Sequence, residues 1–180
     1  GSMVLADSTF ESNQAAHGGA VAAFGGATVT VVGETTFRRN SAANFGGAML
    51  LQPDAILQMN GDHSKMIVEN NNADFGAGVY AINASVNILN GSSLVCVQNV
   101  AVSLGGCMFL QGATVSVEGK NSKIIIDGNT AGVRGGGIDA SATSISVKSN
   151  AVLEVKNSVL NRWYDQVGAG SGSAAGILLE

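Results

Sequence analysis

Carboxylate side chains, which could serve acid–base catalysis, are few and scattered in this chain of 180 residues. Glycoside hydrolysis needs two carboxylates that flank one bond, and metal-assisted cleavage needs acids gathered around the ion. The acids considered fall on different predicted strands and do not converge on one groove; they are Glu69, Glu118, Asp127, Asp139 and Glu154. We therefore expect no catalytic residues, no cofactor and no enzymatic activity.

The two histidines do not indicate a metal site. His17 and His63 lie in different predicted turns, and neither belongs to a zinc-like spacing of Cys, His and Asp residues. No Asp-x-Asp-x-Asp loop is present to bind calcium. We expect no bound metal.

The two cysteines occupy positions where other copies of a repeat, described next, carry small or apolar residues. Cys96 and Cys107 lie on segments that end and begin on opposite sides of a turn. Buried free thiols are the preferred interpretation, and a disulfide within one turn is the alternative.

A repeat organises the whole chain. In five copies an apolar residue is followed three positions later by Asn, and then by a glycine-rich pair and another apolar residue. The apolar residues are Phe10, Phe37, Ile67, Cys96 and Ile126, and the Asn residues are Asn13, Asn40, Asn70, Asn99 and Asn129. The glycines are Gly18, Gly19, Gly46, Gly47, Gly76, Gly105, Gly106, Gly135 and Gly136. Asn bonds neighbouring backbone and glycine permits tight turns, so both sets are predicted to be structural, the first as an internal Asn ladder.

Three short runs of alternating apolar and polar residues fill each period of about 29 residues. In one period they are 48–52, 55–60 and 65–69. Three short strands cannot bury their own apolar face, whereas stacked copies build one continuous core. The pattern predicts an all-β, right-handed parallel β-helix of about five to six turns, with three strands per turn. Residues 1–3 resemble a cloning scar, 4–158 form turns one to five, and 159–180 form a last turn with an enlarged loop at 159–173.

Composition excludes two classes of partner. Charged residues make up 12% of the chain, the formal net charge is −4 and there is no run of Lys or Arg. Such a chain has no electrostatic footprint for nucleic acid, and no stretch of 18 apolar residues is free of polar ones. We expect no nucleic-acid partner and no direct insertion of this segment into a membrane.

One predicted face carries outward apolar side chains on successive turns. A patch of this kind marks a contact surface more often than an accident. The partner-binding residues expected are Leu50, Tyr80, Ile82, Phe109, Trp163 and Tyr164. Alternatively, an adjacent segment of a parent protein, or the long last turn with Trp163 and Tyr164, folds over this face. A second apolar series, at Phe45, Phe75 and Leu104, either shields the turns or adds a contact ridge.

The motif pairs Phe10-Glu-Ser-Asn13 with Gly18-Gly-Ala-Val21, and Phe37-Arg-Arg-Asn40 with Gly46-Gly-Ala-Met49, resemble the repeats of chlamydial polymorphic membrane proteins. The resemblance covers residues 10 to about 179, and the later copies have lost the Phe and part of the glycine motif. It implies a β-helical passenger segment of an autotransporter adhesin at the bacterial outer-membrane surface, a virulence role, and a host-cell surface protein or glycan as partner. Neighbouring β-helix turns of a parent protein are the other contact implied. A purely structural spacer and, third, a carbohydrate-active β-helix are the alternatives.

Overall fold

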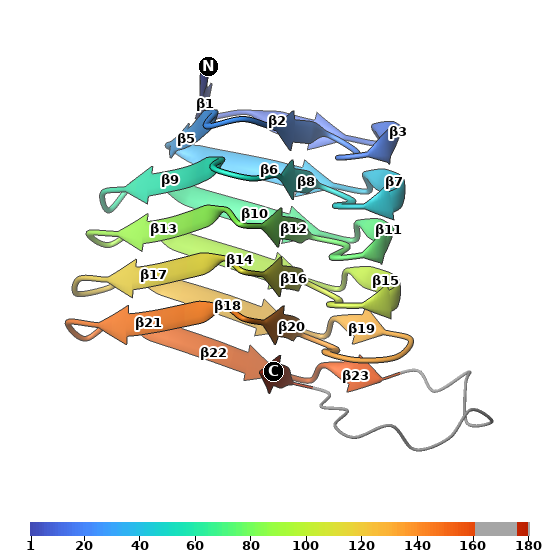
Figure 1. Cartoon of the computed structure of the whole chain (residues 1–180). Helices are drawn as coiled ribbons and strands as arrows, with labels where there is room; N and C mark the ends of the chain where they lie inside the picture. The colour runs from blue at the N-terminus through green and yellow to red at the C-terminus, as the bar shows by residue number, and fades with distance from the viewer. Residues whose placement is uncertain (161–175, 180) are drawn as a thin grey trace.

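The chain winds into a rod of stacked β-strand turns (Figure 1). The structure is a computed structural model, and it describes residues 1–160 and 176–179. Four parallel sheets of six strands each run along the rod, and the described residues form no helix. The predicted parallel β-helix is confirmed. The turn itself differs from the prediction, because it contains four strands rather than three.

Sheets A and B contain the longer strands. Sheet A consists of β1 (Ser2–Ala6), β5 (Thr28–Val32), β9 (Ile56–Asn60), β13 (Ser85–Leu89), β17 (Thr114–Glu118) and β21 (Ser144–Lys148). Sheet B consists of β2 (Thr9–Glu11), β6 (Glu34–Arg38), β10 (Lys65–Glu69), β14 (Ser93–Val97), β18 (Lys123–Asp127) and β22 (Val152–Lys156). Ser2 and Met3, from the segment that resembles a cloning scar, are therefore part of a strand.

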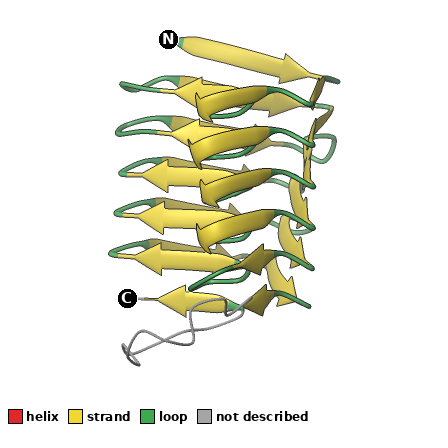
Figure 2. Cartoon of the chain, turned by 90° about the vertical axis from the view of Figure 1, so that its right-hand side faces the viewer, coloured by secondary structure: helices red, strands yellow, loops and turns green. Residues whose placement is uncertain are grey.

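Sheet C is the additional sheet, and its strand follows the Asn motif in each turn. It consists of β3 (Gln14–His17), β7 (Ser41–Phe45), β11 (Asn72–Phe75), β15 (Val100–Leu104), β19 (Thr130–Ala131) and β23 (Val159–Leu160). Sheet D consists of β4 (Val21–Ala23), β8 (Met49–Leu51), β12 (Val79–Ile82), β16 (Met108–Gln111), β20 (Ile138–Ser141) and β24 (Ile177–Leu179). Figure 2 shows the same strands stacked in line from one end of the rod to the other.

The core consists of columns of inward side chains, because alternate residues of a strand point to opposite faces of its sheet. Val86 pairs in register with Leu57 on one side and Val115 on the other, and all three are buried. The inward columns of sheets A and D are buried over the middle of the rod. At the last turn, however, Val147, which pairs in register with the buried Val117, is 40% exposed.

The inward column of sheet B corrects one residue of the predicted motif. Val68, and not Ile67, pairs in register with Phe37 and Cys96, and Val68 is fully buried while Ile67 is half-buried. Met66 and Val68 alternate inward along β10, so Ile67 between them points outward. The motif of this turn therefore runs from Val68 to Asn71, one position later than predicted.

Candidate functional site

Two columns of side chains meet where sheet C turns into sheet D, and they contain the aromatic residues expected to contact a partner. One column descends from His17 through Phe45 to Phe75, with ring centroids 5.1 and 5.7 Å apart. The other stacks Tyr80 on Phe109 at 5.0 Å. Phe45 also stacks on Tyr80 at 4.7 Å, and Phe75 meets the edge of Phe109 at 5.8 Å. We call these five rings the aromatic ladder.

The aromatic ladder covers much of the face that was expected to be free. Leu50 is 1% exposed and Tyr80 is 7% exposed, so the prediction that they form an open contact patch is wrong. Ile82 and Phe109 are half-buried. The expected residues Trp163 and Tyr164 lie outside the described residues. The physical reason is sheet C, which the sequence analysis did not predict: it brings Phe45 onto Tyr80 and Phe75 onto Phe109. Phe45 and Phe75 therefore shield part of this face.

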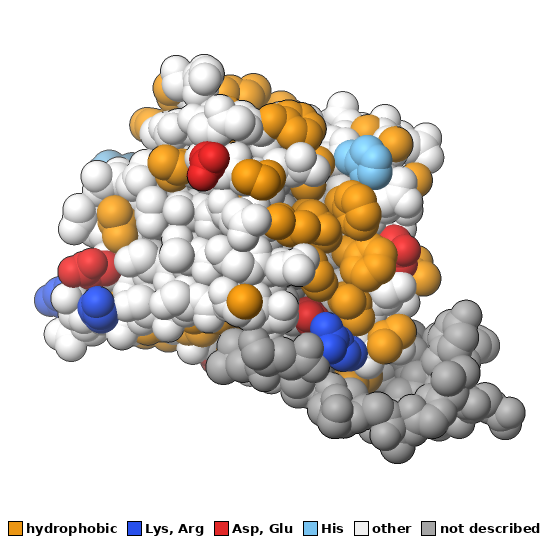
Figure 3. Space-filling view, viewed as in Figure 1, with side chains coloured by type: hydrophobic (Ala, Val, Ile, Leu, Met, Phe, Trp, Pro, Cys, Tyr) orange, Lys and Arg blue, Asp and Glu red, His pale blue; other side chains and the backbone are white. Residues whose placement is uncertain are grey.

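Hydrophobic side chains still reach the surface along this ladder. Figure 3 shows them as a column on the right-hand side of the rod, over β7, β11 and β15 and the adjoining strands of sheet D. Phe45, Phe75 and Phe109 are each half-buried, so each side chain is partly exposed at the surface. The face over sheet A differs, since Figure 3 shows mostly neutral polar side chains there.

An ion pair takes the place of the rings in the fifth turn. Arg134 follows the column of Phe45 and Phe75, and it bridges to Leu104 in sheet C. Asp139 pairs in register with Phe109. The Arg134 guanidinium donates to both Asp139 carboxylate oxygens, at 3.1 and 3.2 Å, and Asp139 is buried. This carboxylate therefore has a structural partner.

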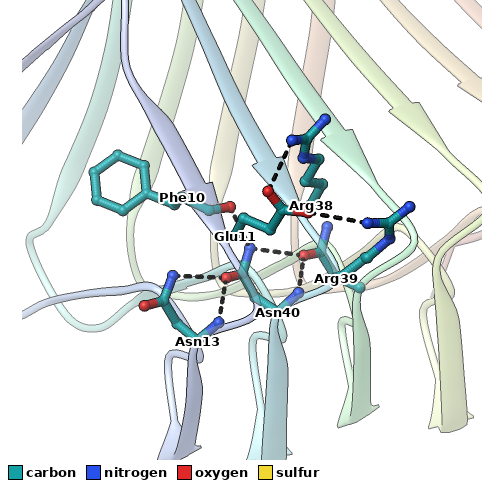
Figure 4. Close-up of polar contacts among 7 residues, drawn as sticks. Phe10, Glu11, Asn13, Arg38, Arg39 and Asn40 are labelled. Atoms are coloured by element: carbon teal, nitrogen blue, oxygen red, sulfur yellow. Dashed lines mark hydrogen bonds and ion pairs between the residues drawn. The ribbon is translucent and has the colours of Figure 1, made fainter.

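The predicted Asn ladder exists, with one member corrected. Asn99 donates from its side chain to Asn129 Oδ1 at 2.9 Å, and its backbone N–H donates to the same oxygen at 3.0 Å. The same pair of bonds joins Asn71 to Asn99 and Asn40 to Asn71. Figure 4 shows the start of the ladder, at Asn13 and Asn40.

Asn70 is not part of this ladder, so its prediction is wrong. Asn71 takes its place and is buried, whereas Asn70 is exposed with φ of 55°. Asn70 occupies the left-handed position before the ladder, which Arg39 and Gln98 occupy in neighbouring turns. The sequence did contain a signal for the correct register: an Ala lies two residues after each true ladder Asn. These alanines are Ala15, Ala42, Ala73, Ala101 and Ala131, and the last four form a small second core.

The glycine pairs are structural, as predicted, and one pair shows why. Gly46 has φ of 66°, a left-handed conformation that side chains other than Asn and Asp rarely adopt. A Cβ on Gly47 would clash with the carbonyl oxygen of Ala77 in the next turn. A side chain at Gly47 would therefore prevent the close approach of the second and third turns at this corner.

Cys96 and Cys107 form a disulfide, contrary to the preferred interpretation of free thiols. Their Cα atoms are 6.1 Å apart, and both side chains are fully buried. The bridge joins the inward face of β14 to the glycine corner before β16, across one turn of the rod. In the sequence the two cysteines lie on either side of β15 (Val100–Leu104). This strand of sheet C carries the chain back across the core, so the two sulfur atoms meet.

The other ion pairs of the described residues are exposed and lie along sheet B rather than in a catalytic cluster. Glu11 accepts from Arg38 at 2.7 Å and from Arg39 at 3.0 Å (Figure 4). The hydrogen bond from Arg38 is the main cause that holds the pKa of Glu11 below its ordinary value. Glu69 and Asp127 share this column, but Val97 separates them by one turn. Such exposed pairs contribute little to stability.

Neither metal chemistry nor a membrane-spanning helix finds support in the described part of the chain. Among residues 1–160 and 176–179, no three His, Cys, Asp or Glu side chains are grouped so that they could hold a metal ion. The same residues include no helix long and apolar enough to cross a bilayer. Comparisons of the chain with protein-family models, with curated proteins and with solved structures find no match.

Proposed function

We propose that this chain is a rigid β-helical segment of a surface-exposed or secreted protein. The observation that carries the proposal is the Cys96–Cys107 disulfide inside the core. Stable disulfides are typical of proteins that fold in oxidising compartments and are rare in the cytosol. The column of stacked turns supports the mechanical part of the proposal, because every turn is tied to the next by four parallel strand pairs.

The distinctive residues of the repeat serve this scaffold. The Asn ladder satisfies buried backbone N–H groups, the glycines allow close stacking, and the aromatic ladder closes one corner of the rod. Because these repeated residues all serve packing and hydrogen bonding within the rod, the rod is rigid. A rigid rod holds the parts of a protein on either side of it at a fixed distance and in a fixed direction. The spacer function is therefore the one that the geometry supports best.

Adhesion is the second candidate function, and the half-exposed rims of the aromatic ladder favour it. Figure 3 shows a column of hydrophobic side chains along this side of the rod, and Phe45, Phe75 and Phe109 are partly exposed. Exposed aromatic groups in a row provide contact area at low conformational cost. This proposal keeps the passenger-type adhesin implied by the resemblance, with a host-cell surface protein or glycan as partner. The contact residues proposed are Phe45, Phe75 and Phe109 in place of the buried Leu50 and Tyr80.

The proposed surface-exposed or secreted location of the protein can be tested on cells of the source organism, with an antibody raised against the folded rod. Labelling of intact cells, or recovery of the protein from the medium, would support the proposal. Labelling that needs permeabilised cells would contradict it.

Adhesion has its own test. Fluorescent rod is applied to host cells, and a Phe75→Leu variant, which keeps an apolar group but removes the ring, is compared with a Val32→Ser variant on another exposed face. Loss of cell binding in Phe75→Leu alone supports an adhesin. Absence of binding by the wild-type rod, measured against a heat-denatured control, leaves the spacer function as the proposal.

A further inference from the structure

The outward face of sheet B, on the side of the rod, carries three columns of side chains. Strands β6, β10, β14 and β18 have five residues each and stack in register along the rod (Figure 1). The second and fourth residues of each strand are buried, so the first, third and fifth point outward. We call the surface formed by these outward residues the B face. It is open to solvent at its edges, since the side chains of Lys65 and Glu34 are 43% and 56% exposed.

The two outer columns of the B face carry opposite charges on the same strand. Wherever the first residue of one of these four strands is charged, the last residue has the opposite sign. The pairs of first and last residues are Glu34 and Arg38 in β6, Lys65 and Glu69 in β10, and Lys123 and Asp127 in β18. In β14 both residues, Ser93 and Val97, are uncharged.

The two charges of one strand lie too far apart to pair with each other. Lys65 and Glu69 are four residues apart, which is about 13 Å along an extended strand. Within the rod, ion pairs instead run along a column: Lys65 contacts Glu34 at 2.9 Å, and Arg38 contacts Glu11 at 2.7 Å. The change of sign across each strand therefore does not serve the ion pairs of a single rod.

An apolar stripe separates the two charged columns. It consists of Ile67, Val95 and Ile125, the middle residues of β10, β14 and β18, which lie in register on three successive turns. All three side chains are half-buried, so part of each is in contact with water. Covering such apolar groups is favourable. A partner that fits the B face therefore has an apolar centre, acids opposite the lysines and bases opposite the acids.

A second copy of the B face meets these requirements in one orientation. We consider two rods packed face to face about a two-fold axis that runs along the rods, over the apolar stripe. Each turn then lies opposite the same turn of the second copy, and the strands of the two faces run in opposite directions. The first column of one copy lies against the last column of the other, so Lys65 faces Glu69 and Lys123 faces Asp127. Packed sheets are about 10 Å apart, a gap that these side chains span from both sides.

The opposite orientation of the second copy brings like charges together. If the two rods ran in opposite directions, with β14 of one copy over β14 of the other, β10 would lie over β18. Lys65 would then face Lys123, and Glu69 would face Asp127. Like charges across an interface disfavour an arrangement, so the charge pattern selects rods that run in the same direction.

The area of the B face indicates how strong the contact is. Five turns about 4.8 Å apart and strands of five residues give a face of roughly 24 by 16 Å, or about 400 Å². Stable interfaces bury about 800 Å² on each partner. We therefore expect weak association, with a Kd of about 100 μM.

We propose that two copies of the rod associate side by side through their B faces, in the same direction and in register. Ile67, Val95 and Ile125 of both copies form the centre of the contact, and the complementary charges lie on either side of it. A two-fold contact uses the same surface of both copies, so it closes as a dimer. The inference goes beyond the proposed function, and it holds for a spacer and for an adhesin alike.

Sedimentation velocity from about 10 μM to about 1 mM tests the proposal, because this range brackets the expected Kd. The variants Lys65→Glu and Glu69→Lys each reverse one charge of the B face. The matched controls are Lys120→Glu, in the turn before β18, and Glu118→Lys, at the end of β17 in sheet A. They make the same changes of charge at exposed positions outside the B face. Circular dichroism checks that all four variants fold.

We expect the wild-type chain and both controls to dimerise as concentration rises. Lys65→Glu and Glu69→Lys should each dimerise about tenfold more weakly on their own, because like charges then meet twice in each dimer. An equimolar mixture of these two variants should dimerise as wild type does. In the mixed dimer the introduced Glu faces the introduced Lys, and the unchanged Glu69 of one variant faces the unchanged Lys65 of the other.

Three results would overturn the proposal. The first is a wild-type chain that stays at 18.1 kDa at every concentration. The second is a pair of B-face variants that dimerise as wild type does, or whose mixture dimerises no better than each variant alone. The third is stronger dimerisation of Lys65→Glu, which would show that the rods run in opposite directions and that residue 65 faces Lys123.

Discussion

The ring of Tyr80 lies on that of Phe45, with centroids 4.7 Å apart, although the two residues belong to neighbouring turns of the rod. Phe109 stacks on the other face of Tyr80 at 5.0 Å. A residue held between two rings in this way contributes to the stability of the fold, whatever else it contacts. The mutational behaviour of Tyr80 therefore distinguishes a scaffold residue from an open binding residue.

Tyr80→Ser is expected to lower the free energy of unfolding by about 3 kcal/mol, because it removes a buried ring and leaves a cavity. Tyr80→Phe keeps the stacking and should stay within about 1 kcal/mol of wild type. Urea denaturation followed by circular dichroism measures both. A Tyr80→Ser variant as stable as wild type would show that the ring is not held between Phe45 and Phe109.

Burial gives Tyr80 a characteristic pH dependence. Desolvation raises the pKa of its phenol above the ordinary value of 10.0, since the charged form is disfavoured away from water. The contribution of the neutral Tyr80 phenol to the free energy of unfolding is therefore fully present below pH 10. It is lost as the pH rises through the raised pKa of the folded state. In a Tyr164→Phe background Tyr80 is the remaining tyrosine, and phenolate absorbance should rise at higher pH in the folded chain than in urea. Equal midpoints in the two states would contradict the burial of the phenol.

The Cys96–Cys107 bridge closes a loop with a sequence separation of 11 residues. Loop-closure entropy gives a stabilisation of about 3 kcal/mol for a bridge of this span. The double variant Cys96→Ala, Cys107→Ala should lose about that amount in urea denaturation, plus a smaller packing loss. Thiol titration of unfolded wild-type protein without reductant provides the direct check. Finding two reactive thiols there would show that the bridge does not form.

Much of the fold could be predicted from sequence because each column repeats one residue type. The apolar character of Val29, Leu57 and Val86 is enough to predict that they form an inward column. Sheet C lacked such a signal, because its inward residues are alanines and its outward residues vary from Gln14 to Val100. A strand whose core side chain is one methyl group leaves no strong alternation. Missing this sheet is why the face around Tyr80 was expected to be open.

Two further predictions were wrong for related reasons: the motif register at residues 67–70 and the free thiols at Cys96 and Cys107. Val68-Glu69-Asn70-Asn71 fits the motif in two registers, and apolar spacing alone does not choose between them. The Ala two residues after Asn71 does choose, because only that register places it in the alanine core. The disulfide could not be read from spacing, since it depends on how the intervening strand β15 folds back across the turn.

Thr35 offers a stabilising substitution. Its side chain is fully buried in an inward position of β6, in register with Met66, and its hydroxyl has no hydrogen-bond partner among the described residues. An unpaired buried hydroxyl costs free energy, and valine has nearly the same shape. Thr35→Val is expected to raise the free energy of unfolding by about 1 kcal/mol. A matched Thr36→Val change, on the outward face, should have little effect; a destabilised Thr35→Val variant would show that the hydroxyl is bonded.

The adjacent residues Asn70 and Asn71 test the central claim, that the repeated residues are the internal scaffold of a stacked rod in this register. Asn71 Oδ1 accepts two bonds from Asn40, and its side-chain amide donates to Phe37 O and to Asn99 Oδ1. Asn70 is exposed in a left-handed conformation that glycine adopts freely.

The decisive measurement is the urea-denaturation free energy of Asn71→Ala beside that of Asn70→Gly. The first variant leaves the buried backbone N–H of Asn40 without a partner, and we expect it to lose about 3 kcal/mol or more. The second should remain within about 0.5 kcal/mol of wild type. Equal losses, or a larger loss for Asn70→Gly, would contradict the register of the ladder and with it the account of the rod.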